Sequence, residues 1–128
     1  MDFGAPTSLR DLSFDARDLG AASDLPYDPD KYFDLRLNCI AVSLEQLAIT
    51  RARPKGVSSA AGIMRQCLAG KHPKRKPITI EPNEGAPGWI VVDGNSTVLN
   101  AWASGWRDIP CNQGEQEAVN HPVSAVAV

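Results

Sequence analysis

The chain has 128 residues, of which 43% are hydrophobic and 22% charged, and its formal net charge is −2 at pH 7. This ordinary apolar fraction with a small net charge excludes bulk disorder, and no stretch approaches the roughly 18 uninterrupted apolar residues of a membrane span. We expect one globular domain with extensions and no membrane partner. The three cysteines lack zinc spacing, and the N-terminus lacks a basic, apolar leader, so we expect a cytoplasmic protein.

Residues 1–37 are rich in Asp, Pro and Gly, and residues 1–40 contain eight aspartates against four basic residues. Leu9, Leu12 and Phe14 give a weak apolar pattern that predicts at most one short helix. We therefore expect residues 1–37 to form an acidic N-terminal extension without a core of its own.

The apolar, β-forming residues over 37–42 predict a strand, followed by a helical turn over 43–47 and a basic loop over 50–57. A helix is expected over 58–70. The Ser58 hydroxyl can accept a hydrogen bond from a first-turn amide, and Gly70 can adopt the left-handed conformation that ends a helix.

The rest of the chain predicts one hairpin, one helix and one last strand. In chain order we expect a basic loop over 71–77, a strand over 78–80, a turn over 82–88, a strand over 89–92, a helix over 98–104, a strand over 109–111 and a tail over 113–128. The sequence thus predicts an α+β domain over 38–112, with a small mixed sheet and helices.

Basic residues are concentrated in one part of the chain. Residues 46–80 contain eight of them and no acidic residue. An acid-free block of this length favours a surface for phosphates. The side chains we assign to nucleic-acid contact are Arg51, Arg53, Lys71, Lys74, Arg75 and Lys76. The alternative is a solvated face, partly neutralised by the acidic extension folding over it.

The segment Asp93–Thr97 places a glycine turn between a predicted strand and a predicted helix. Free amides at a helix start attract anions, and Gly94 lets a ligand approach the backbone closely. Asn95, Ser96 and Thr97 offer side-chain donors there. In the alternative interpretation Asn95 or Ser96 is only an N-cap. Asp93 could bind Mg²⁺ beside a phosphate or simply cap the following helix.

These features occur in an order that resembles the ParB/sulfiredoxin-like superfamily. The residues that carry the resemblance are Ile40 to Leu47, Arg51 to Pro54, Ser58 to Leu68, Gly70, Pro77 to Ile80, Ile90 to Gly94, Ala101, Gly105 and Ile109-Pro110. The resemblance covers about 72 of the 128 residues. It implies a small α+β fold that binds nucleotide phosphates at the Asp-Gly turn. Members include CTP-binding partition proteins, sulfiredoxins, free-serine kinases, nucleases and small plasmid proteins that suppress DNA transfer.

The chain departs from the family pattern at the turn. The family carries an arginine where Thr97 stands, and sulfiredoxins carry a cysteine where Asn95 stands, so sulfinic-acid reduction is excluded. Only 17 residues follow Cys111, so we do not expect the sequence-specific operator binding that partition proteins achieve with a helix-turn-helix domain. We expect Arg65 on the preceding helix, or Lys71, Lys74, Arg75 or Lys76 in the loop before the hairpin, to supply the missing charge.

The sequence therefore predicts a ParB-like domain that binds nucleotide or nucleic-acid phosphate, with a role on a plasmid or another mobile element. ATP or CTP with Mg²⁺ is the expected ligand, and Asp93 is the candidate catalytic residue of an NTPase or nuclease. The alternative is a non-catalytic interaction module, an inhibitor or adaptor, that uses the acidic extension to bind a protein partner.

Overall fold

The computed structural model describes residues 2–113, and side chains from residue 5 onward. The expected tail over 113–128 lies outside the described residues, apart from residue 113. The strands are β1 (Asp2–Ser8), β2 (Ile40–Ser43), β3 (Leu47–Arg51), β4 (Ile78–Pro82), β5 (Trp89–Asp93) and β6 (Asp108–Asn112). The α-helices are α1 (Pro29–Tyr32), α2 (Pro54–Leu68) and α3 (Asn95–Ala103), and three short 3-10 helices are η1 (Leu9–Asp11), η2 (Ala16–Leu19) and η3 (Leu44–Gln46).

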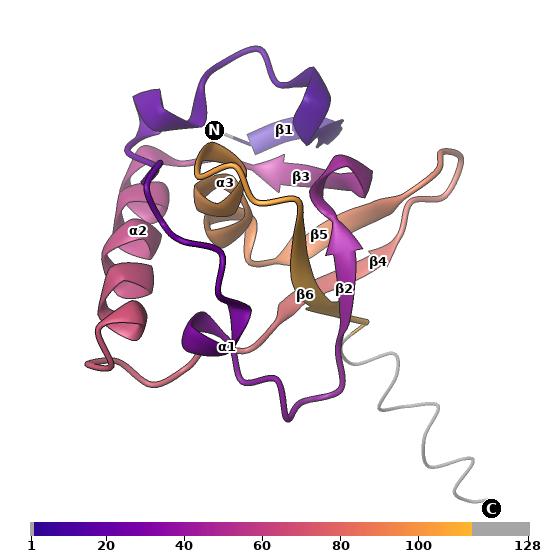
Figure 1. The fold of residues 1–128 in the computed structure, drawn as a ribbon. Coiled ribbons are helices and arrows are strands. Elements are labelled where there is room, and N and C mark those ends of the chain that lie inside the picture. The colour runs from indigo at the N-terminus through magenta and orange to yellow at the C-terminus, as the bar shows by residue number, and fades with distance from the viewer. Residues whose placement is uncertain (1, 114–128) are drawn as a thin grey trace, which may run out of the picture.

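All six strands form one mixed sheet in the order β1-β3-β5-β4-β6-β2. The pairs β3–β5 and β4–β6 are parallel, and the other three pairs are antiparallel. Three strands separate β2 from β3 in this order, yet the three residues of η3 connect them. The sheet must therefore curve strongly, so that β2 crosses in front of the central strands in Figure 1. The expected α+β class with a mixed sheet is confirmed.

Helices α2 and α3 pack against each other on one side of the sheet (Figure 1). In α2 the buried residues recur every three or four positions, as a helix covering a core requires. They are Val57, Ala60, Ala61, Met64 and Cys67. Among residues 2–113 there is no helix long and apolar enough to cross a membrane.

Several expected boundaries were wrong. Helix α2 begins at Pro54 with Arg53 as its N-cap, so Ser58 does not cap it. Proline suits the first helical position because its missing N–H would have no acceptor there. Helix α3 begins at Asn95, three residues earlier than expected. The predicted hairpin over 78–92 is confirmed as the antiparallel pair β4–β5.

The N-terminal segment, expected to be an extension, belongs to the same core. Leu9, Leu25, Tyr32 and Phe33 are at most 3% exposed. The Trp106 indole N–H donates to the Leu25 carbonyl oxygen at 2.9 Å. Residues 9–33 thus supply part of the core of the domain.

Candidate functional site

The candidate site lies where the two parallel strands β3 and β5 end. Each strand leads directly into a helix, β3 into α2 and β5 into α3. In mixed α/β sheets the carboxyl ends of parallel strands, with helices starting beside them, form the usual crevice for ligands. The Asp93–Thr97 turn lies at this edge.

Helix α3 starts abruptly because of Gly94, its N-cap residue. Gly94 has φ +105°, a left-handed conformation that side chains other than glycine rarely adopt. A Cβ atom there would lie 2.6 Å from Ile78 Cδ1. The first bond inside the helix runs from the Val98 N–H to the Gly94 oxygen, 2.9 Å away. The N–H groups of residues 95–97 therefore have no hydrogen-bond acceptor within the helix. They carry the positive end of the helix dipole.

The side chain of Asn95 is tied into the fold. Its Oδ1 accepts from the Thr50 N–H at 2.9 Å, and its Nδ2 donates to the Thr50 Oγ1 at 3.1 Å. Asn95 and Thr97 are each 4% exposed, whereas Ser96 is half-buried. The prediction that Asn95 or Ser96 caps the helix is wrong, because Gly94 is the N-cap and no side chain caps it. Asn95 instead joins the start of α3 to the end of β3.

A pocket of about 250 Å³ opens beside this helix start. The residues lining it are Arg51, Gly56, Ser59, Ala60, Ile63, Arg75 and Asp93 to Thr97. They come from β3, α2, the loop before β4, and the turn between β5 and α3. The pocket therefore brings together seven of the predicted site residues from three separate parts of the chain.

Two arginines give the pocket its positive charge. Arg51 is the last residue of β3, whereas Arg75 lies in the loop before β4. The backbone of Arg75 is held in place, because its N–H donates to the Tyr32 oxygen and its oxygen accepts from the Asp34 N–H, both at 2.8 Å. Neither guanidinium has a hydrogen-bond or ion-pair partner among the side chains that the structure describes. Both line the pocket, where an anion would lie beside them.

Asp93 is the single carboxylate among the described residues that line the pocket. Among the side chains of residues 5–113, no three His, Cys, Asp or Glu are grouped so as to hold a metal ion. Mg²⁺ that accompanies a nucleotide needs only one or two carboxylates, because phosphate oxygens and water complete its shell. Asp93 is one carboxylate of this kind.

The other predicted basic residues lie outside the pocket lining. Arg65 forms an ion pair with Asp24, and Lys74 forms one with Asp30. Arg53, Lys71 and Lys76 are exposed. Of Arg65 and the basic residues of the loop before β4, Arg75 alone lines the pocket.

Helix α2 contributes four lining residues that the sequence did not predict as site residues, Gly56, Ser59, Ala60 and Ile63. Gly56 and Ser59 fell in or beside a segment expected to be loop, because the start of α2 was placed at Ser58. A Cβ atom on Gly56 would lie 3.1 Å from the Ser96 Oγ, so this glycine lets the two helix starts approach each other. The dipeptide Arg53-Pro54, with proline at a helix's favoured first position, was the signal that could have placed the start correctly.

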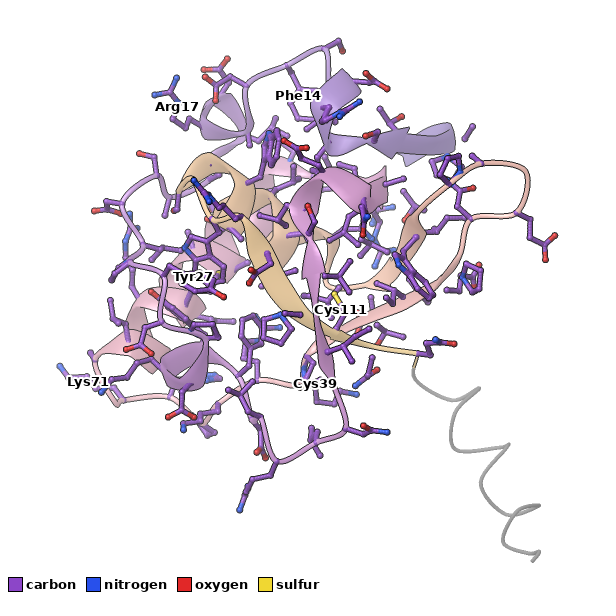
Figure 2. The ribbon with its side chains drawn as sticks, turned by 45° about the vertical axis from the view of Figure 1, so that its right-hand side comes forward. Phe14, Arg17, Tyr27, Cys39, Lys71 and Cys111 are labelled. Atoms are coloured by element: carbon purple, nitrogen blue, oxygen red, sulfur yellow. The ribbon has the colours of Figure 1, made fainter. Side chains whose placement is uncertain are left out.

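The thiols are not part of this site. Burial raises the pKa of the Cys67 thiol, and it raises the pKa of the Cys111 thiol to about 12. Cys111 lies in the sheet close to Cys39, on the side of the molecule shown in Figure 2. A protonated, buried thiol is a poor nucleophile, so Cys67 and Cys111 serve packing.

Comparisons with protein-family models, curated proteins and solved structures found no match for the chain.

Proposed function

We propose that the chain binds the phosphate groups of a nucleotide or a nucleic acid in the pocket between Arg51, Arg75 and the start of α3. The observation that supports this is the convergence of two arginines without described partners on the free amides of one helix start. Bidentate guanidinium contacts and helix-start amides are both recurrent ways in which proteins hold phosphate oxygens.

The proposal includes a ParB/sulfiredoxin-like fold whose phosphate site is the Asp-Gly turn. The amides of Ser96 and Thr97 would donate to phosphate oxygens, with the Ser96 hydroxyl beside them. Thr97 stands where that family carries a clamping arginine, and Arg75 would supply this charge from another loop. An arginine would thus still stand at the phosphate site, although it comes from a different position in the sequence.

With ATP or CTP, Mg²⁺ would be held by Asp93 together with phosphate oxygens. Bound there, the ion would neutralise phosphate charge beside the two arginines. Asp93 would orient it from the end of β5, and the amides of α3 would bind the remaining oxygens. Whether this binding leads to hydrolysis is read directly by product analysis of the same samples.

The test is a titration of the full chain with ATP and CTP, with and without Mg²⁺, for the wild type and single arginine variants. Arg51→Ala and Arg75→Ala should each weaken binding about 10-fold or more, because a hydrogen bond to a charged group contributes about 1.5–3 kcal/mol. Arg10→Ala is the matched control, since Arg10 is exposed and lies outside the pocket. Binding that is absent, or equal in all variants, would overturn the proposal and favour the interaction module.

A further inference from the structure

A second group of cations lies next to the pocket and outside it. We call this group the α2 basic surface and define it by four exposed residues of α2 and the loop that follows. They are Arg65, Lys71, Lys74 and Lys76. Lys74 and Lys76 flank Arg75, which lines the pocket, so the positive charge continues from the pocket onto this surface. Figure 2 shows Lys71 at the end of the molecule opposite Arg17.

Two carboxylates from the N-terminal segment lie on this surface. Asp24 Oδ1 is 3.3 Å from Arg65 Nη2, and Asp30 Oδ1 is 3.1 Å from Lys74 Nζ. Leu25, which follows Asp24, and Tyr32, two residues after Asp30, anchor this segment in the core. The two carboxylates are therefore held beside the cations by the fold itself.

These ion pairs are open to exchange. The side chains of Arg65 and Asp24 are 55% and 76% exposed, and those of Lys74 and Asp30 are 47% and 72% exposed. Exposed pairs of this kind contribute little stability and are screened by salt. A phosphate that approached Arg65 or Lys74 could replace the carboxylate at small cost.

From these contacts we propose that the α2 basic surface binds the sugar-phosphate backbone of a nucleic-acid duplex, and that Asp24 and Asp30 occupy the places of two backbone phosphates when it is absent. The inference rests on the proposed function, because it names the ligand whose phosphate enters the pocket. Because these cations lie outside the pocket, a ligand that contacts them as well as the pocket must carry further phosphates along a backbone. The lining of the pocket and the four residues of the surface include no aromatic ring, so base stacking is not part of the contact.

The proposal that Asp24 and Asp30 occupy phosphate positions is tested with Asp24→Asn/Asp30→Asn in the full chain. The probes are a labelled 20-base-pair DNA duplex of arbitrary sequence, the RNA duplex of the same sequence, and ATP. Removing two competing carboxylates should tighten duplex binding about threefold to tenfold at low salt and leave ATP binding unchanged. The charge-matched control is Asp11→Asn/Asp18→Asn, on exposed residues outside this surface, which should change duplex binding much less.

The contact itself is tested with Lys71→Ala/Lys76→Ala. Each lost phosphate contact should lower the slope of log K against log salt concentration by about 1, so the double variant should lose about 2. Arg10→Ala/Arg17→Ala removes the same charge at the opposite end and should keep the slope. Comparison of the DNA duplex with the RNA duplex shows which of the two nucleic acids the surface binds.

The outcomes separate this inference from the proposed function. Binding of ATP that depends on Arg51 and Arg75, without binding of either duplex, would overturn the inference and leave the proposed function standing. Duplex binding with an unchanged salt slope in Lys71→Ala/Lys76→Ala, or without tightening in Asp24→Asn/Asp30→Asn, would also overturn it. Absence of both ATP and duplex binding would remove the proposed function itself.

Discussion

At the scale of single residues, two asparagines of α3 hold the site together. Asn95 joins the helix start to Thr50 at the end of β3. Asn100 is fully buried, and its Oδ1 accepts from the Ala22 N–H while its Nδ2 donates to the Val57 and Ser96 oxygens. One side chain therefore connects the N-terminal segment, α2 and α3, and all of its bonds are made inside the core.

Replacing Asn100 should be costly. Asn100→Ala would leave the buried Ala22 N–H without its acceptor, at about 1–3 kcal/mol, and would remove the Nδ2 hydrogen bonds to the Val57 and Ser96 oxygens. We expect a total loss of about 2–4 kcal/mol in the free energy of unfolding, measured by urea denaturation. Asn83→Ala, in the exposed turn between β4 and β5, is the comparison. Equal losses in the two variants would contradict the assigned role of Asn100.

The sequence indicated where the turn is but not which atoms it leaves free. Asp93 to Thr97 were found from a strand, a glycine and a helix in succession, which is local information. The partner of Asn95 is 45 residues away in the chain, so no local pattern could show that its amide is already bonded. Arg75 was selected only as a member of a basic run, because its entry into the pocket depends on backbone bonds to Tyr32 and Asp34.

At the scale of elements, the pocket exists because α2 and α3 start side by side. Strand β3 was missed because its residues continue a buried run rather than alternate, as expected for a strand covered on both faces. Without β3, the parallel pair β3–β5 and the crevice at its end could not be predicted. The hairpin and the body of α2 were predictable because turn residues and a helical apolar stripe are local signals.

The close approach of α2 and α3 predicts different effects of alanine substitution at the two glycines of α2. Gly62 is exposed inside α2 with nothing within 4 Å of its Cβ position, so Gly62→Ala should stabilise the protein by about 0.5–1 kcal/mol. Gly56→Ala should gain less or lose stability, because its Cβ would lie 3.1 Å from the Ser96 Oγ. Thermal and urea unfolding of the two variants provide the measurement. A larger gain at Gly56 than at Gly62 would show that the helix starts do not constrain each other.

At the scale of the whole molecule, the N-terminal segment is built into the domain. Tyr27 donates its hydroxyl hydrogen to the Asp108 carboxylate at the start of β6, and the Tyr32 hydroxyl donates to the Pro26 oxygen at 2.8 Å. Tyr27, labelled in Figure 2, lies against the core, and its ring meets the Trp106 ring edge-on. The composition of residues 1–37 suggested an extension because its few apolar residues are widely spaced, yet most of them reach the core.

These contacts predict a loss of stability in alkaline solution. The hydrogen bond to Asp108 raises the pKa of Tyr27 to about 12, and burial raises the pKa of Tyr32 to about 12. An unfolded tyrosine titrates near ~10, so the folded state holds the proton more tightly. The stabilisation is present below about pH 10 and is lost as the pH rises towards about 12.

Urea unfolding from pH 8 to 11 measures this loss, with Tyr27→Phe as the comparison. The variant should be less stable than the wild type near neutral pH, because it lacks the bond to Asp108. Its stability should also fall less steeply above pH 10, because one of the two tyrosines with a raised pKa has been removed. An identical pH dependence in both proteins would contradict the part assigned to Tyr27.

The central claim is that the start of α3 holds phosphate, and an amide-resolved NMR titration with ATP tests it most directly. The account predicts that the amide signals of Ser96 and Thr97 shift most as ATP is added, with smaller shifts at Gly56 and Ser59. In Arg75→Ala the same shifts should require about 10-fold more ATP or a still higher concentration. Shifts confined to other parts of the chain, or unchanged signals for residues 94–97 at saturating ATP, would contradict it.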